Sequence, residues 1–353
     1  MEHSRENAVA VLGLELCTPL GLTARATLAE MAAGTVRFLM MKVRDAQGEP
    51  VRASVLTLLE PDMGRTERVA AMAVTALDAC RTHAEALGVE RLPLLLALPE
   101  EERGAGLEVP ALLGALMGAV APIRLDVLPG AVLRKGRAGL FVALRMASEL
   151  LRTGQANCVL VGAADSLCDE HTLSGLAKAG RCLSSSTRDG IIPGEGAGFL
   201  LLTTSRVLVR RGLASRAWVL AGALAREPRP FLLGRPSQAD GLTEAFRQLR
   251  QHPVAGTRRV DHVLSGQTGE RFWAREFTHA YLRNVALMPE PLTVSLIAES
   301  LGDAGAASAV IQLGYALYLL QKQERVLGRA PRALVYGCSD GGDVGACVVE
   351  CGA

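Results

Sequence analysis

The chain has 353 residues, of which 49% are hydrophobic and only 4% aromatic, so it can bury a large core built mainly from Leu, Val and Ala. Its 38 basic and 36 acidic residues leave a net charge of +2, which gives no bulk attraction to nucleic acid or to an anionic membrane. The eight cysteines show neither a CxxC nor a His-paired spacing, so we expect neither a disulfide framework nor a zinc site.

Signals for secretion and membrane insertion are also missing from the sequence. The N-terminus lacks a basic start, and Glu15 and Pro19 interrupt its apolar segment, which argues against a signal peptide. No apolar run reaches membrane-spanning length without a charge or a proline. We therefore expect a cytoplasmic protein that binds no cofactor, metal, nucleic acid or membrane.

The first half of the chain alternates apolar strands with helices. Strands are predicted at 8–14, 92–98, 123–127, 158–164 and 198–202, and helices at 23–34, 65–87, 106–119 and 137–152. Residues 35–60 are predicted to be irregular, with one weak strand. A polar loop is expected at 183–190, before the glycine-rich turn that leads into the strand at 198–202.

The helix at 137–152 is the centre of this plan, because apolar side chains cover almost all of its faces. A helix of that kind belongs in the middle of a domain. It opens with Gly136-Arg137-Ala138-Gly139, and such glycines let other segments approach while the helix N–H groups point into a potential site.

The second half repeats the first in outline. Strands are predicted at 218–222, 260–264, 292–296, 332–337 and 345–349, and helices at 241–251, 271–285 and 302–322. The opening of the last helix, Gly302-Asp303-Ala304-Gly305, mirrors Gly136-Arg137-Ala138-Gly139. The chain is therefore divided into two similar halves, 1–205 and 206–353, whose apolar helices pair in the centre of five layers.

Several short motifs identify a family for this plan. They are the turn Thr18-Pro19-Leu20-Gly21, the segments Leu183-Ser184 and Arg188-Asp189-Gly190, and the turn Gly194-Glu195-Gly196-Ala197-Gly198 with the strand that follows it. Together with the central helix and its following strand, these motifs resemble the β-ketoacyl synthases of the thiolase-like superfamily. The resemblance covers nearly the whole chain and implies the duplicated α/β thiolase-like fold, with αβαβα layers.

The resemblance also shows what is missing. The position of the family's catalytic cysteine falls on Arg137, and the histidine of its "HGTGT" motif falls on Gly266 or Gln267. The histidine of "GHSLGAAG" falls on Glu299, and the gating phenylalanine of "FGFGG" falls on Asp340. Because thiolate and histidines carry out the condensation in the family, these are degenerate site positions, and no catalytic residue is expected.

Other residues could in principle replace the lost thiol. Arg137 cannot act as nucleophile or base, because its side chain does not lose its proton. Cys338 and Cys182 lie on loops that the family's fold brings towards the site, but without a histidine nearby we expect both to be inert. We expect Arg137, Glu299 and Asp340 to form an ion-pair cluster, and the alternative is an Arg137 that turns to solvent.

Two functions follow from the resemblance. The favoured one is a non-catalytic homologue that acts as a protein-binding partner, scaffold or adaptor, as chain-length factors do beside polyketide synthases. Non-catalytic relatives in type VI secretion effector clusters carry a "GER" stretch similar to Gly269-Glu270-Arg271. The partner would then be an acyl carrier protein of a polyketide or fatty-acid cluster, or a secretion effector. The alternative is an acyltransferase or hydrolase with altered catalytic residues that acts on carrier-bound or CoA-bound acyl groups.

The resemblance also bears on assembly. Ketosynthase-like folds pair an edge strand across a two-fold axis, which covers an edge that would otherwise be sticky. In this chain the strand at about 123–128 has that place, so we expect a homodimer. A heterodimer with an active synthase stays open.

Overall fold

The computed structural model describes residues 8–352, except for the side chains at 102 and 325–327. Ten strands form one continuous sheet, which consists of two five-stranded halves, here called the first and the second sheet, that repeat one arrangement. The strands of the first sheet are β1 (Val9–Cys17), β4 (Arg91–Leu98), β5 (Arg124–Arg134), β6 (Cys158–Ser166) and β7 (Glu195–Thr204). Those of the second are β8 (Ala217–Arg226), β9 (His262–Ser265), β10 (Val294–Leu296), β11 (Arg332–Cys338) and β12 (Asp343–Cys351).

The two sheets have the same strand order and the same directions. The first runs β5-β4-β6-β7-β1 and the second β10-β9-β11-β12-β8. In each, the first two pairings are parallel and the last two antiparallel. Residues 9–11 of β1 pair with 217–219 of β8 and join the sheets edge to edge. This repeated topology confirms the predicted duplicated α/β fold.

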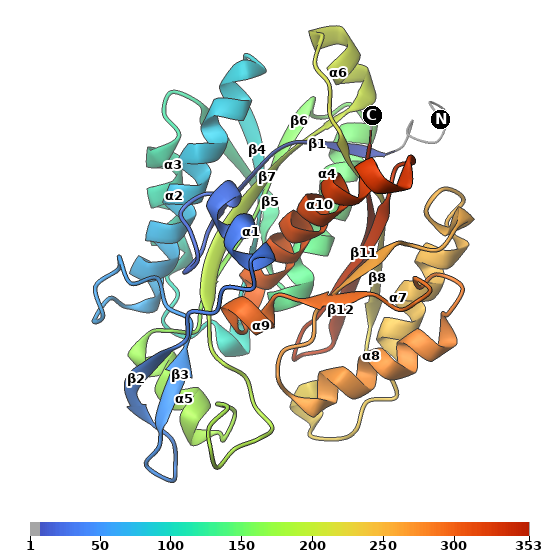
Figure 1. Ribbon diagram of the computed structural model, residues 1–353. Helices are drawn as coiled ribbons and strands as arrows, with labels where there is room; N and C mark the ends of the chain where they lie inside the picture. Colours follow the sequence, from blue (N-terminus) through green and yellow to red (C-terminus); the bar gives the residue numbers. More distant parts are fainter. Residues whose placement is uncertain (1–7, 353) are drawn as a thin grey trace.

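Helices form the other layers (Figure 1). The helices are α1 (Ala24–Ala32), α2 (Arg65–Ala86), α3 (Val109–Ala119), α4 (Gly139–Arg152), α5 (Glu170–Lys178), α6 (Ser205–Arg211), α7 (Asp240–Gln251), α8 (Arg271–Arg283), α9 (Ala298–Leu301) and α10 (Ser308–Leu327). The helices α2 and α3 cover one outer face, α7 and α8 the other, and α4 and α10 lie between the sheets. Burying large side chains such as Phe141 of α4, which is 1% exposed, contributes roughly 1.5–3 kcal/mol each.

Both central helices begin in the same way. Gly136 (φ +52°) and Gly305 (φ +56°) each open a 3-10 turn, η3 (Gly136–Ala138) and η6 (Gly305–Ala307), that continues into α4 or α10. Only glycine adopts such angles without cost. A Cβ on Gly305 would also lie 2.0 Å from Oδ2 of Asp165. The correspondence expected between 302–305 and 136–139 is therefore wrong by three residues.

Some elements differ from the sequence expectations. Residues 35–60 contain a hairpin, β2 (Leu39–Arg44) and β3 (Pro50–Ala53), rather than one weak strand. The strand expected at 123–127 extends to Arg134, because a bulge lets it resume pairing with β4 after residue 131. β5 lies at the end of the sheet, as expected for the strand at 123–128.

Candidate functional site

The two 3-10 turns and the carboxyl ends of β4 and β11 meet at one place between the sheets. Arg137 lies in η3, at the start of the central helix α4, and is 5% exposed. Glu100 follows β4, and Asp340 follows β11, so the fold brings side chains from both halves to the end of α4. Arg137 therefore points into the protein, which excludes the alternative of a solvent-facing side chain.

Three acceptors surround the Arg137 guanidinium. Nη1 lies 2.7 Å from Oδ2 of Asp303, Nη2 lies 2.6 Å from Oδ1 of Asp340, and Nε donates to the carbonyl of Cys338 at 2.9 Å. Burial by itself lowers the pKa of Arg137, but the charges of Asp303 and Asp340 outweigh it and hold that pKa above its ordinary value. The group is therefore a fixed cation at the start of the central helix.

Asp340 forms ion pairs with three arginines. Besides Arg137, its carboxylate accepts from Nη1 of Arg181 at 2.8 Å and pairs with Nη2 of Arg103 at 2.5 Å, and the residue is only 1% exposed. Three guanidinium groups thus share one carboxylate. The expected ion pair between Arg137 and Asp340 is present.

Arg181 also pairs with a second carboxylate, that of Glu270. Glu270 accepts two hydrogen bonds from Arg181, at 2.7 and 2.8 Å, and a third from Nε1 of Trp273 at 3.0 Å. The Trp273 ring lies 4.7 Å from the Arg137 guanidinium, and the Phe231 ring lies 4.2 Å from that of Arg181. Aromatic faces attract such cations. The Glu of the "GER" stretch is therefore part of the site.

Glu100 lies on the other side of Asp340. Its two oxygens accept from the backbone N–H groups of Gly341 at 2.7 Å and Asp340 at 3.2 Å. Burial raises the pKa of Glu100, and the nearby charge of Asp340 adds to this, while the Gly341 hydrogen bond opposes it.

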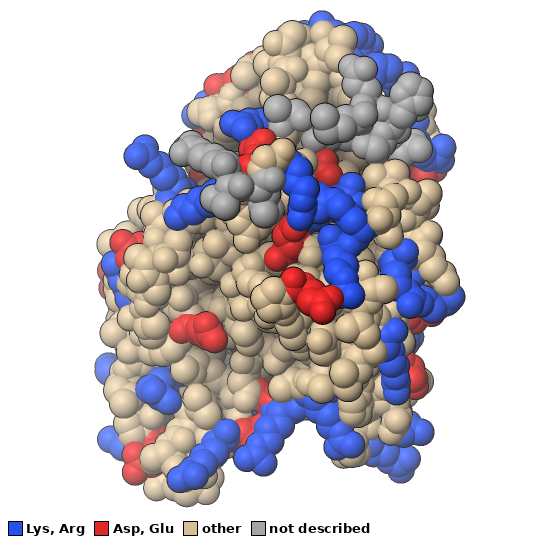
Figure 2. Space-filling model, turned by 45° about the vertical axis from the view of Figure 1, so that its right-hand side comes forward, with Lys and Arg blue, Asp and Glu red and all other residues tan. Residues whose placement is uncertain are grey.

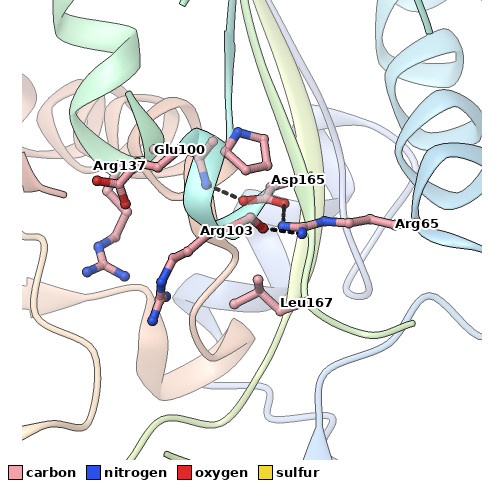
Figure 3. A pocket seen from close by; sticks show the side chains of 10 residues that line it. Arg65, Glu100, Arg103, Arg137, Asp165 and Leu167 are labelled. Carbon is pink, nitrogen blue, oxygen red and sulfur yellow. Dashed lines mark hydrogen bonds and ion pairs between the residues drawn. The ribbon is translucent and has the colours of Figure 1, made fainter. Parts of the chain in front are cut away.

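A cavity of about 20 Å³ lies beside these groups, and its lining includes Arg65, Glu100, Arg103, Arg137 and Asp165. Figure 3 shows Arg65 meeting Asp165, and Nη2 of Arg65 lies 2.8 Å from Oδ1. Nε of Arg65 is buried without a hydrogen-bond partner. Space for one water molecule needs roughly 10–15 Å³ by this measure, so the cavity is water-sized and leaves no room for an acyl chain.

We call these residues the charged cluster. Its members are Arg65, Arg103, Arg137, Arg181, Glu100, Asp165, Glu270, Asp303 and Asp340. The pairs Arg137–Asp303, Arg103–Asp340 and Arg181–Glu270 each join a residue before position 205 to one after it. The cluster therefore links the two halves of the chain.

Glu299 does not belong to the cluster, so that part of the expectation is wrong. It lies on the four-residue helix α9, and its side chain is exposed. The chain turns at Gly302 (φ +66°), after which Asp303, 1% exposed, enters the interior, and its Oδ1 accepts from the Gly305 N–H at 3.0 Å. The second carboxylate that pairs with Arg137, beside that of Asp340, therefore comes from the glycine-rich segment before the second central helix.

Gly266 and Gln267 follow β9 and contribute no charge. A Cβ on Gly266 would lie 2.7 Å from the carbonyl oxygen of Tyr336 and 3.1 Å from Cα of Gly337. On Gly337, a Cβ would lie 2.4 Å from the carbonyl oxygen of Arg137. Gly266 thus packs against β11 beside the cluster, where its lack of a side chain is a packing requirement.

The two candidate thiols are buried. Burial raises the pKa of Cys182 to about 11, and that of Cys338 well above its ordinary range. The nearby charge of Glu276 adds to the second effect. A thiolate is the nucleophilic form of cysteine, so neither group is activated.

The sequence singled out Arg137 and Asp340 but missed the roles of Arg103, Arg181 and Asp303. Of these three residues, only Asp303 lies in a motif, the segment 302–305, from which its place in the site could have been predicted. Glu195, in the motif Gly194-Glu195-Gly196-Ala197-Gly198, binds Arg68 through two hydrogen bonds of 2.7 and 2.8 Å. That pair holds the turn and lies outside the cluster.

The described part of the chain, 8–352, contains no group of side chains able to hold a metal ion and no helix long and apolar enough to cross a membrane. Figure 2 shows both signs of charge over one face, with Lys and Arg bordering a hollow at its lower margin.

Comparison with known proteins finds similarity to ketosynthases, in agreement with the fold. A family model for the N-terminal domain of β-ketoacyl synthases matches residues 138–207. Polyketide synthase GfsA from Streptomyces halstedii is 26% identical in an alignment 217 residues long, and the match covers 56% of this chain and 3% of that protein. This chain therefore spans only a small part of that relative.

Solved structures match over 98% of this chain. The ketosynthase from module 6 of the bacillaene synthase from Bacillus subtilis 168 gives a TM-score of 0.77 at 14% identity, over 72% of that chain. The AntDE:AntF complex, a type II PKS acyl-carrier protein with its ketosynthase, gives 0.77 at 14% identity, over 99% of that chain. The chain has the thiolase-like ketosynthase fold, and its segment 138–207 is similar to the N-terminal domain of β-ketoacyl synthases.

Proposed function

We propose that the protein is a non-catalytic ketosynthase homologue that acts by binding other proteins. The observation that carries this proposal is the buried Arg137, held by Asp303 and Asp340 at the start of the central helix. Decarboxylative condensation needs an acyl-enzyme thioester and stabilisation of the charge that develops. A guanidinium ion with two carboxylates supplies no thiolate to form that thioester, and the water-sized cavity beside it admits no acyl chain.

The experiment is incubation of the purified protein with acyl-CoA and with acyl carrier protein, followed by intact-protein mass measurement. The proposal expects no acyl adduct under conditions in which an active ketosynthase is fully acylated. Acylation of one residue in stoichiometric amount would instead favour the acyltransferase or hydrolase, and Cys338 and Cys182 would be examined first.

We also propose a homodimer that forms through β5. This strand lies at the edge of the sheet and follows α3, whose sequence VPALLGALMGA contains no polar residue although its Met117 is 50% exposed. A helix at the surface that has no polar side chains is expected to have its outer face covered by a partner chain.

Three further expectations stay predictions. They are the partner protein (a carrier protein or a secretion effector), the cytoplasmic location and the division of the chain at residue 205.

Sedimentation equilibrium at micromolar concentration tests the dimer. We expect a mass of twice the 37.2 kDa of one chain. Leu128→Arg places a charge on the β5 edge, where Leu128 is 38% exposed, and should shift the mass towards one chain. Val209→Arg, at an 81% exposed position on α6, is the matched control. A single-chain mass for the unmodified protein would count against the dimer.

A further inference from the structure

A second cavity lies at the amino ends of β4 and β6. Its volume is about 190 Å³, and three segments form it: the turn between α2 and β4, the start of β6, and the helix α6. By the same measure one water molecule needs only roughly 10–15 Å³, so this cavity has room for a small organic molecule. The lining residues are Leu87, Val89, Asn157, Cys158, Val207, Arg210 and Arg211.

This cavity is separate from the charged cluster. Cys158 of the cavity and Asp165 of the cluster are both in β6, and their separation along the strand is about 23 Å at about 3.3 Å per residue. Every residue of β6 is buried, so the strand passes through the core between the two places. Figure 1 shows α6 projecting from the upper end of the molecule, whereas α9, which precedes the second central helix, lies in the lower half.

Part of the lining is apolar. Leu87 and Val207 are 4% and 5% exposed, and Val89 is half-buried. We call these three residues the apolar wall. Cys158 adds to this surface, because burial raises the pKa of its thiol to about 11 and keeps it uncharged near neutral pH.

The rest of the lining carries hydrogen-bond donors and positive charge. Nη2 of Arg210 donates to Oδ1 of Asn157 at 3.1 Å, which leaves the Asn157 amide N–H groups to donate elsewhere. A Cβ on Gly88 would lie 4.0 Å from Nη1 of Arg211, so that side chain extends from α6 to the turn between α2 and β4. Among the described residues that line the cavity, none carries a carboxylate.

The arginines of α6 have no acidic partners. The helix sequence SRVLVRR contains three arginines and no acidic residue, and within residues 8–352 none of the three forms an ion pair. By contrast, Arg81 of α2 and Arg152 of α4 each pair with a glutamate one turn away. Helix polarity favours cations in the last turn of α6, but it explains neither Arg206 at the other end of the helix nor the apolar cavity.

This combination suits a ligand that has a doubly charged oxyanion and a short carbon chain. A guanidinium group donates paired hydrogen bonds to phosphate oxygens, and two such groups match the charge of a phosphate monoester, about −1.5 to −2 at pH 7. The apolar wall provides the surface that a carbon chain needs.

We propose that this cavity binds a small phosphate monoester, with the phosphate group at Arg210 and Arg211 and the carbon chain against the apolar wall. The proposal is independent of whether the charged cluster is catalytic and of whether the protein binds other proteins.

Isothermal titration calorimetry of the full chain at pH 7.5 tests this site. The probe is n-butyl phosphate, compared with methyl phosphate and n-butanol. We expect butyl phosphate to bind once per chain with a Kd of about 1 mM, and butanol, which lacks the anion, to give no binding. Each CH₂ group that is buried tightens binding up to about fourfold, so methyl phosphate should bind about tenfold more weakly than butyl phosphate.

Two variants and a matched control locate the binding. Arg210→Gln and Arg211→Gln should each weaken butyl phosphate binding about tenfold, because each removes a charged donor of the phosphate. Arg206→Gln removes an exposed, unpaired cation from the same helix but outside the cavity lining, and it should bind as the unmodified protein does. Equal affinity of all three variants for butyl phosphate would overturn the site.

A five-residue peptide with a central phosphoserine separates a free phosphate ester from a phosphorylated protein segment. We expect it to bind about tenfold more weakly than butyl phosphate, because it has no carbon chain to place against the apolar wall. Peptide binding as tight as that of butyl phosphate would overturn the assignment to a small molecule. Absence of butyl phosphate binding to the unmodified protein would overturn the whole proposal, and that measurement needs no variant to fold.

Discussion

Replacing Asp340 by alanine should be among the most damaging single substitutions in this protein. The side chain is 1% exposed and pairs with Arg137, Arg103 and Arg181 at 2.6, 2.5 and 2.8 Å. Removing one partner of a buried ion pair costs about 3–5 kcal/mol. Here Arg137 keeps Asp303 and Arg181 keeps Glu270, while Arg103, at 21% side-chain exposure, can reach water. We therefore expect Asp340→Ala to lower the free energy of unfolding by the lower end of this range, about 3 kcal/mol.

This free energy converts into a measurable melting temperature. Unfolding entropy of about 2.1 cal/mol/K per residue gives roughly 0.74 kcal/mol/K for a chain of 353 residues. Asp340→Ala should therefore lower Tm by about 4 °C in calorimetry. Asp340→Asn, which keeps the shape but removes the charge, should lower it by less.

Glu299→Ala supplies the matched control. It removes the carboxylate that the sequence assigned to the cluster but that the structure places in solvent, so its effect should stay within about 0.5 kcal/mol. Equal shifts of Tm for Asp340→Ala and Glu299→Ala would refute the argument that buried pairing, rather than local charge, stabilises this region.

Three further outcomes are expected. Iodoacetamide at pH 8 should find no hyper-reactive thiol, because burial raises the pKa of Cys182 to about 11 and that of Cys338 further, and fast alkylation of either would contradict this. Arg68→Met should destabilise by about 3–5 kcal/mol in urea unfolding, because it leaves the fully buried Glu195 unpaired, whereas Arg81→Met removes only exposed pairs and should cost less than about 1 kcal/mol. The stability that Glu276 contributes is complete below pH 4.5 and is lost as the pH rises through about 7, a total of roughly 3 kcal/mol that Glu276→Gln should abolish.

Most of the fold could be predicted because apolar periodicity is strong in this chain. The helix at 65–87 and the strand at 92–98 agree with α2 and β4 to within a residue, because both are bounded by polar or turn-forming residues. The hairpin β2–β3 and the helix α6 were missed. In β2, exposed and half-buried residues occur in turn, and neither face of the strand is fully buried. The sequence therefore shows no clear apolar periodicity that would predict this strand.

The site was predicted less completely, for a geometric reason. A motif places residues along the chain, whereas a cluster depends on which side chains point inwards. Glu299 and Asp303 are four residues apart, and the positive φ of Gly302 between them decides that the second enters the protein. Arg103 and Arg181 reach Asp340 from a 3-10 turn and from a loop, and neither approach leaves a periodic signal.

The charged cluster also predicts that a cysteine introduced at position 137 would be a poor nucleophile. Arg137→Cys removes the cation and leaves Asp303 and Asp340 beside the introduced thiol. Neighbouring carboxylates and burial both disfavour a thiolate, so its pKa should rise although it stands at the start of α4. We expect alkylation by iodoacetamide at pH 8 at least tenfold slower than for a free thiol, together with no acyl adduct from acyl-CoA. The double variant Arg137→Cys with Asp340→Asn should react faster than the single one, because one of the two charges is gone. Rapid alkylation of the single variant would mean that the helix start, rather than its carboxylate neighbours, controls this position.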